Sequence, residues 1–241
     1  MNRRKLLSLL GITGISMLGR HSSISAGGEE VSRKMISCVV TPQQTEGPYF
    51  IDERLRRSDI RSDPSDGSVK DGLPLALEIC VFTVGSGADG CLPLSNAIVD
   101  IWHCDAQGVY SDVQDRNFNT VGKKFLRGYQ VTDRNGSARF ITIYPGWYPG
   151  RTVHIHFKIR TDPGYARGRE FTSQLYFDDA ITDKVHAQPP YAGQARKGSY
   201  QRRARNKDDS IFLKGGEQLM LKLTEADHGY AAKFDVGLEA W

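Results

Sequence analysis

Residues 129–143 read Tyr-Gln-Val-Thr-Asp-Arg-Asn-Gly-Ser-Ala-Arg-Phe-Ile-Thr-Ile, and this stretch decides the fold class. Two β-prone runs, 129–132 and 138–143, flank Asn135-Gly136, a residue pair that tolerates positive φ and favours a tight hairpin turn. Short β-rich runs separated by turn residues continue over 75–223, and no stretch keeps a helical period for long. The sequence therefore predicts a mostly β protein.

Eight β-rich runs are expected as strands, at 75–83, 97–104, 129–132, 138–143, 152–160, 171–177, 217–223 and 231–237. Many short strands with Gly- and Asp-rich connections are typical of a sandwich or barrel. We expect an all-β fold with long loops, a single-domain β-sandwich over residues 75–241. Residues 27–74 contain many turn formers and few apolar residues, so they are expected as an N-terminal arm.

Residues 178–209 are expected as a long loop, because they contain Pro189-Pro190 and several glycines. Six basic residues lie between positions 196 and 207. Loops of this length in a compact domain are often functional. Two interpretations are open: a solvated basic loop, or a rim that attracts anions to a pocket.

Residues 1–26 have the pattern of an export signal. Arg3-Arg4-Lys5 precede an apolar run over 6–18, and Ile24-Ser25-Ala26 provides a small-residue cleavage site. The adjacent arginines resemble a twin-arginine signal, with a general secretory signal as the alternative. The apolar run is shorter than the roughly 20 residues that span a bilayer. We therefore expect a periplasmic or secreted protein without a membrane span.

The formal charge of +4 comes from this segment, which contains four basic residues and no acidic one. A neutral remainder with about a quarter of charged residues argues against a disordered chain and against nucleic-acid binding. The four cysteines are Cys38, Cys80, Cys91 and Cys104. Export permits disulfides, but the spacing does not choose among the three pairings and contains no CxxC zinc motif.

The run Thr152-Val153-His154-Ile155-His156-Phe157-Lys158-Ile159 contains two of the six histidines in a strand pattern. Because side chains alternate along a strand, both imidazoles share one face, and the apolar residues share the other. The two histidine α-carbons are about 6.6 Å apart, which allows both rings to converge on one ion. His154 and His156 are therefore predicted as paired metal ligands, although surface strands also carry such pairs by chance.

Two tyrosines complete a coherent donor set. Tyr148 lies in the turn-rich segment that ends at Arg151, directly before the histidines, and Tyr110 follows the end of the strand expected over 97–104. Phenolate is a hard anionic ligand, so two of them select a trivalent ion such as Fe(III). Because free tyrosine has a pKa near 10, a strong local cation is needed to keep it ionised at neutral pH.

Several motifs resemble the intradiol ring-cleavage dioxygenases. They are Thr45-Glu46-Gly47-Pro48-Tyr49-Phe50, Pro93-Leu94-Ser95-Asn96-Ala97-Ile98-Val99-Asp100-Ile101-Trp102, Gly108-Val109-Tyr110, Arg127-Gly128-Tyr129, Pro145-Gly146-Trp147-Tyr148, His154-Ile155-His156-Phe157 and Gln174-Leu175-Tyr176-Phe177. Their order and rough spacing match from about residue 41 to 223. The tyrosines, the His-x-His pair and the arginine three residues before it make the resemblance specific.

The resemblance implies a β-sandwich with one non-haem Fe(III) per chain, held by Tyr110, Tyr148, His154 and His156. It further implies that Arg151 and Gln174 face the substrate, with Tyr148 accepting a proton from it. The expected reaction joins a catechol and O2 to give a muconate-type diacid. Substrates compatible with the basic loop are a carboxylated catechol, a hydroxyquinol or a larger polyphenol. A homo-oligomer is also an expectation taken from the resemblance.

Two alternative functions remain open. The 93–102 run with Gly108-Val109-Tyr110 also occurs in prealbumin-like binding modules without metal, and the same four ligands could hold copper or zinc. Other titratable residues are assigned no catalytic role. His103 is expected to be either packed or at a sheet edge. His186 and His228 are expected at the surface, and Tyr49 is expected to line a pocket without binding metal.

Overall fold

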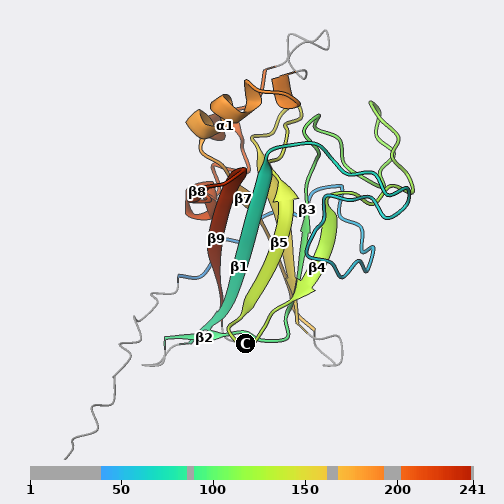
Figure 1. Cartoon of the computed structure of the whole chain (residues 1–241). Coiled ribbons are helices and arrows are strands. Elements are labelled where there is room, and N and C mark those ends of the chain that lie inside the picture. The colour runs from blue at the N-terminus through green and yellow to red at the C-terminus, as the bar shows by residue number, and fades with distance from the viewer. Residues whose placement is uncertain (1–38, 86–89, 162–167, 193–201, 240–241) are drawn as a thin grey trace, which may run out of the picture. The chain divides into compact units, whose positions relative to one another are not determined.

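The computed structural model describes residues 39–85, 90–161, 168–192 and 202–239. Strands dominate these residues and form two sheets (Figure 1), so the predicted all-β fold is confirmed. The predicted signal segment 1–26 lies outside them, as does Cys38. None of the helices in the described part of the chain has the length and apolar character that a membrane crossing requires.

The first sheet has the order β2-β1-β9-β8, and β5 also pairs with β1. Its strands are β1 (Pro74–Val84), β2 (Cys91–Pro93), β5 (Ser137–Ile143), β8 (Leu223–Ala226) and β9 (Gly229–Glu239). The second sheet has the order β4-β3-β6-β7. Its strands are β3 (Ile98–Trp102), β4 (Arg127–Val131), β6 (His154–Arg160) and β7 (Glu170–Tyr176). Among the pairings between these described strands, that of β1 with β9 is parallel and the others are antiparallel.

Strand alternation builds the core between the sheets. Leu75, Leu77 and Ile79 of β1 and Ile155 and Phe157 of β6 are almost fully buried in one hydrophobic cluster. Because successive strand residues point to opposite faces, the even-numbered residues of β6 lie on the outer face of the second sheet. That face is buried as well, which requires a cover of loops and the N-terminal arm.

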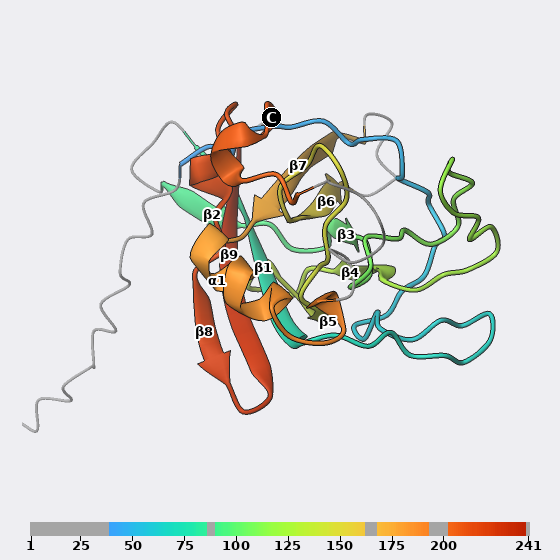
Figure 2. The same cartoon turned by 90° about the horizontal axis from the view of Figure 1, so that it is seen from above.

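The arm crosses the outer face of the second sheet (Figure 2, blue). The Gln44 amide donates to the carbonyl of Thr172 in β7, and the Arg57 amide donates to Tyr129 in β4. Between these points, the Phe50 ring packs on Trp102 at 4.8 Å. The arm then pairs through Ile60 with Ile141 in β5. It therefore covers the face that carries the two histidines.

The predicted hairpin at Asn135-Gly136 is wrong. Gly136 has the expected positive φ of 75°, but β4 pairs with β3 and β5 pairs with β1. The turn therefore crosses from one sheet to the other. A Cβ on Gly136 would lie 2.3 Å from the Val81 carbonyl oxygen, so tight packing on β1, as well as the turn, requires glycine here.

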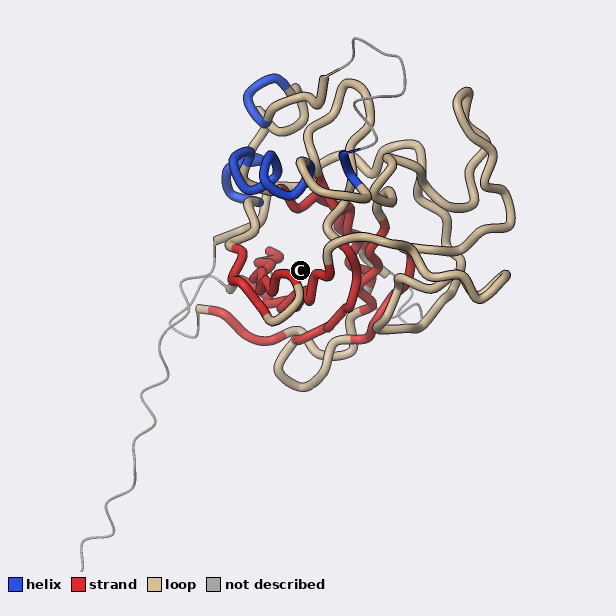
Figure 3. The backbone as a smooth tube through the Cα atoms, turned by 45° about the horizontal axis from the view of Figure 1, so that its top comes forward, coloured by secondary structure: helices blue, strands red, loops and turns tan. Residues whose placement is uncertain are grey.

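The C-terminal half also differs from the prediction. Part of the run expected as a strand at 217–223 is a 3-10 helix (Gly216–Leu219), and only its last residue enters β8. The expected loop 178–209 contains α1 (Asp179–His186) and a 3-10 helix (Asn206–Asp208). Asp178 caps α1 by accepting the Ala180 and Ile181 amides, a helix-start signal that the loop interpretation overlooked. Figure 3 shows these helices (blue) on one side of the strands (red).

The cysteines at the described positions 80, 91 and 104 are of two kinds. Cys91 is disulfide-bonded, whereas Cys80 and Cys104 are buried free thiols. Burial raises the pKa of both free thiols above the usual value, so both are protonated.

Candidate metal centre

Strand register aligns the centre of the site. His156 of β6 lies opposite Trp102 of β3 and opposite Gln174 of β7, and His154 lies opposite Tyr176. These side chains form two rows across the outer face of the second sheet. The predicted common face of His154 and His156 is therefore present, and both rings are almost fully buried.

Two loops bring the tyrosines to this face. The loop after β3 carries Tyr110, and the segment before β6 carries Tyr148. The two loops touch at Gly146, whose amide donates to the Asp105 carbonyl at 3.1 Å. A Cβ on Gly146 would lie 2.5 Å from that oxygen, so only glycine allows this close approach. The Tyr110 and Tyr148 rings then meet edge to face at 5.7 Å.

The donor atoms converge. The Tyr148 hydroxyl lies 3.1 Å from Nε2 of His154, and this Nε2 lies 3.0 Å from Nε2 of His156. The Tyr110 ring lies 6.3 Å from the His156 ring. The structure thus brings all four predicted ligands together. In the described part of the chain, no three His, Cys, Asp or Glu side chains gather as metal ligands.

Both histidines are neutral. Burial, with a smaller contribution from the charge of Arg151, lowers the pKa of His154 to about 3. Burial and the neighbouring His154 hold the pKa of His156 well below its usual value. Nδ1 of His154 lies 2.7 Å from the Thr152 carbonyl, which can only accept, so the proton is on Nδ1. Nε2 therefore presents a lone pair, the form in which imidazole binds metals.

Both phenols are protonated in the absence of a cation. Burial raises the pKa of Tyr148 above its usual value, and burial together with Tyr148 holds the pKa of Tyr110 well above its usual value. The Tyr110 hydroxyl is buried and makes no hydrogen bond to the described residues. A buried hydroxyl without a partner costs about 1–3 kcal/mol. A metal ion would remove this cost by ionising and binding the oxygen, so these residues fit a hard cation.

Arg151 is anchored beside the donors by two partners. Its Nε donates to the Asp209 carboxylate at 2.8 Å and its Nη2 donates to the Gln174 side-chain oxygen at 2.5 Å. Its Nη1 lies 3.4 Å from Nε2 of His154. Burial opposes the charge on Arg151, but Tyr148 and Asp209 keep its pKa above the usual value. A fixed guanidinium of this kind stabilises negative charge that develops next to it.

The arm completes the site. Gln174 donates to the Thr45 carbonyl at 2.8 Å, and Gly47 packs so closely that a Cβ would lie 3.3 Å from Cε1 of His156. The Tyr49 ring packs on Tyr110 at 4.6 Å, while its hydroxyl donates to Asp115 at 2.8 Å. Tyr49 therefore lines the donor cluster with its hydroxyl bound elsewhere.

The burial of the other described histidines agrees in part with the prediction. His103 is fully buried and lies 2.6 Å from the Thr142 hydroxyl through Nε2, and His228 is exposed. His186, predicted at the surface, is half-buried because its ring stacks on Tyr191 at 5.0 Å. Sequence reasoning missed Asp209, which lies 58 residues from Arg151 along the chain and has no recognisable motif.

Comparisons with known proteins agree with this geometry. A family model described as Dioxygenase matches residues 45–198. The protocatechuate 3,4-dioxygenase beta chain of Burkholderia cepacia is 35% identical over 123 residues, which cover 48% of this chain and 51% of that protein. Catechol 1,2-dioxygenase of Acinetobacter baylyi is 31% identical over 156 residues, covering 56% and 45%. This chain thus spans about half the length of these curated relatives.

Two solved structures are similar over most of the described fold. An intradiol ring-cleavage dioxygenase from Tetranychus urticae has a TM-score of 0.69 at 29% identity, covering 84% of this chain and 95% of that chain. The dioxygenase domain of a dioxygenase and carbohydrate-binding protein fusion from Streptomyces sp. SirexAA-E has a TM-score of 0.57 at 28% identity, covering 84% and 100%. Since the family model also matches well over half of the sequence, the chain belongs to the intradiol ring-cleavage dioxygenase family.

Proposed function

We propose that this chain is an iron-dependent intradiol dioxygenase, which inserts both atoms of O2 into a catechol-type ring and releases a muconate-type diacid. One observation carries the proposal: the Tyr148 hydroxyl and the Nε2 atoms of His154 and His156 converge within hydrogen-bond distance, beside a Tyr110 hydroxyl that has no hydrogen-bond partner among the described residues. The named relatives are protocatechuate and catechol dioxygenases, which supports this reaction class.

Tyr110, Tyr148, His154 and His156 would hold one Fe(III) per chain. Two phenolates and two neutral imidazoles favour a trivalent ion over zinc. When bound, the iron would supply the Lewis acidity and the redox chemistry that a catecholate needs to react with O2.

The two tyrosines differ in access. Tyr110 is 1% exposed, whereas Tyr148 is half-buried. Tyr148 is therefore the tyrosine that an incoming catechol reaches, and its high pKa as a free phenol makes its phenolate a strong base. We assign it the role of accepting a proton from the substrate hydroxyl. Arg151 would stabilise the negative charge of the ring, and Gln174 would hold Arg151 in place.

The proposal is tested by a visible spectrum of purified protein, iron quantified on the same sample, and catechol added without oxygen. A strong visible band at about one iron per chain that shifts with catechol, followed by diacid formation on adding O2, is the expected result. Colourless protein that binds zinc would instead indicate a different metal. Protein that remains colourless after reconstitution with iron would support a metal-free binding module.

We also propose that the protein is exported, in line with the signal pattern at residues 1–26. The disulfide at Cys91 supports an oxidising compartment, because disulfides persist there and are rare in the cytosol. Cell fractionation with a variant in which Arg3 and Arg4 are replaced by lysine tests the twin-arginine route. Unchanged export of this variant would point to the general secretory route.

A further inference from the structure

A cavity is lined by residues that take no part in the chemistry described above. Its volume is about 640 Å³, within the range of small-molecule sites. We call it the side cavity. Its lining includes aromatic and basic residues from the segment before Tyr148, from the end of α1 and from the segment after position 201, among them Trp147, His186, Tyr191, Arg202, Arg205 and Lys207.

Two lining residues of the side cavity are sequence neighbours of residues in the metal centre. Trp147 directly precedes Tyr148, and Asp208 directly precedes Asp209, which binds Arg151. Neighbouring α-carbons are about 3.8 Å apart, so both lining residues lie next to residues of the centre. The Thr152 hydroxyl also donates to the side-chain oxygen of Asn206 at 2.5 Å, which fixes the basic segment against the start of β6.

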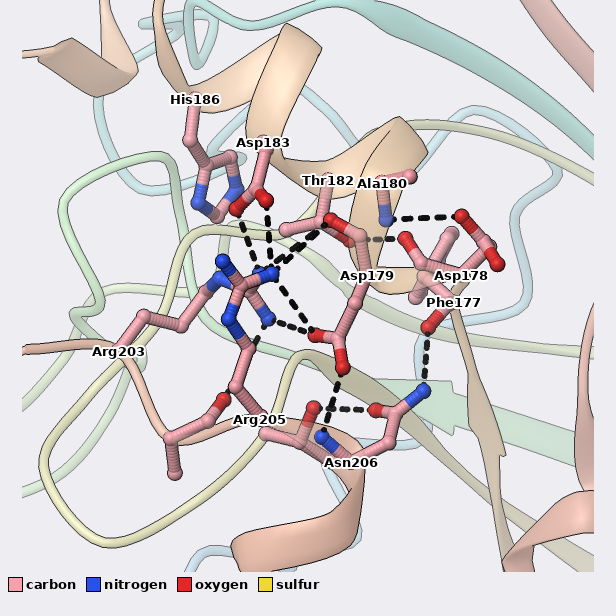
Figure 4. Close-up of polar contacts among 12 residues, drawn as sticks. Phe177, Asp178, Asp179, Ala180, Thr182, Asp183, His186, Arg203, Arg205 and Asn206 are labelled. Atoms are coloured by element: carbon pink, nitrogen blue, oxygen red, sulfur yellow. Dashed lines mark hydrogen bonds and ion pairs between the residues drawn. The ribbon is translucent and has the colours of Figure 1, made fainter.

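Two guanidinium groups are held in place at this cavity (Figure 4). Arg203 binds Asp183 at 2.8 Å as well as Asp179, and Arg205 binds the other oxygen of Asp183 at 2.7 Å through Nη1. Nε and Nη2 of Arg205 make no hydrogen bond to the described residues. These two nitrogens form the side of a guanidinium that binds a carboxylate through two parallel hydrogen bonds.

The charge of the cavity favours an anion. Asp179 and Asp183 balance Arg203 and Arg205. Arg202 and Lys207 are exposed and make no ion pair with described acids, and Asp208 is the one further acid in the lining. The lining therefore retains a net positive charge, and Trp147 and Tyr191 offer aromatic walls to an apolar spacer.

We propose that the side cavity binds the carboxylate-bearing side chain of an extended catecholic substrate, with Arg205 as the partner of the carboxylate and the catechol ring at the metal centre. This inference rests on the proposed function and narrows its substrate class. It predicts that a catechol with a carboxylate at the end of a short side chain is preferred over its neutral ester.

The test compares kcat/KM for 3-(3,4-dihydroxyphenyl)propionate, its methyl ester and catechol. Arg205→Gln should lower the acid-to-ester ratio about fivefold, the scale of a partly exposed ion pair, and leave catechol unchanged. Arg205→Lys keeps the charge and the contact with Asp183 but loses the paired nitrogens, so it should recover only part of the ratio. Arg134→Gln removes an exposed charge in the turn between β4 and β5 and should change nothing.

The outcomes separate this inference from the proposed function. Wild-type protein without any preference for the acid, or an Arg205→Gln variant with an unchanged ratio, would overturn the side-cavity proposal. If no catechol is turned over, the proposed function fails, and calorimetric titration with 3-phenylpropionate then tests the cavity directly. Binding that is weakened by Arg205→Gln would support the site, and no binding to the wild type would overturn it.

Discussion

Trp102 and His156 stack face to face, with ring centroids 4.9 Å apart and ring planes 7° apart. The register between β3 and β6 places them opposite each other. The stacking matters because Nδ1 of His156 is buried without a hydrogen-bond partner among the described residues, whereas Nδ1 of His154 is bound to the Thr152 carbonyl. His154 is thus oriented by a hydrogen bond, and His156 by the indole that stacks on its ring and by the arm at Gly47, which lies close to its Cε1.

Replacing Trp102 with leucine should loosen His156 and weaken iron binding by roughly tenfold, the lower end of effects seen when a ligand loses its support. The measurement is iron retention during titration with a chelator, followed by the visible band. Trp102→Phe keeps a flat ring and should retain iron nearly as well as the wild type. Equal loss of iron in both variants would show that stacking does not orient His156.

Gly47→Ala should affect the metal centre through its close approach to the His156 ring. Gly47 has a φ of 74°, and an added Cβ would meet the His156 ring at 3.3 Å. Gly67→Ala is the matched control, because Gly67 has a φ of 76° and nothing within 4 Å of an added Cβ. Both variants should lose about 1 kcal/mol of unfolding free energy through backbone strain. Only Gly47→Ala should also weaken iron binding, and parallel behaviour of the two would contradict the contact.

How much of this structure the sequence predicted depends on how far apart along the chain the interacting residues lie. Local alternation located β6 and the common face of its histidines, because a strand fixes side-chain direction by itself. The turn at Asn135-Gly136 was assigned to a hairpin because a local motif does not report which sheet each flanking strand joins. In the structure, register with β1 and β3 decides this.

The metal centre shows the same division between local patterns, which the sequence reveals, and tertiary contacts, which it does not. His154 and His156 are two residues apart, so spacing alone revealed them, and the tyrosines followed from the chemistry of the donor set and the resemblance. Asp209 and the stacking of Trp102 on His156 depend on tertiary contacts between distant segments. No pattern of one sequence encodes these contacts, which is why the support of the site was missed while its donors were found.

Asp209 should make stability depend on pH. Burial alone would raise its pKa, but the Thr152 amide and the charge of Arg151 outweigh burial and hold the pKa below its usual value. The folded pKa therefore lies below the unfolded value of about 3.9, so Asp209 stabilises the fold above about pH 4, and this contribution is lost as the pH falls further.

Asp209→Asn should accordingly lower the unfolding free energy by about 3 kcal/mol at pH 7, because it leaves Arg151 without its anion in a buried setting. Urea unfolding should show the two proteins converging as the pH falls below about 4. Asp59→Asn serves as the control, since the pair between Asp59 and Arg61 is partly hydrated and contributes little. A constant difference between wild type and Asp209→Asn from pH 7 to pH 3 would contradict the assignment.

Tyr110→Phe should separate function from stability. In the metal-free protein, its hydroxyl is buried and has no hydrogen-bond partner in the part of the chain that the structure describes. Its removal should therefore raise the unfolding free energy by about 1 kcal/mol, the lower end of the cost of an unpaired buried group. Tyr144→Phe is the matched control: the Tyr144 hydroxyl is also buried but lies 2.7 Å from the Thr182 hydroxyl, so its loss should destabilise by about 1 kcal/mol. The measurement is denaturant unfolding of metal-free protein.

The same Tyr110→Phe variant should lose most of the visible band after reconstitution with iron, whereas Tyr144→Phe should retain it. If Tyr110→Phe makes the metal-free protein more stable and also loses the visible band, the Tyr110 hydroxyl binds the metal and destabilises the metal-free fold. If Tyr110→Phe instead destabilises the metal-free protein as much as Tyr144→Phe does, the hydroxyl has a structural partner, and the fit of this centre to a cation loses its main physical support.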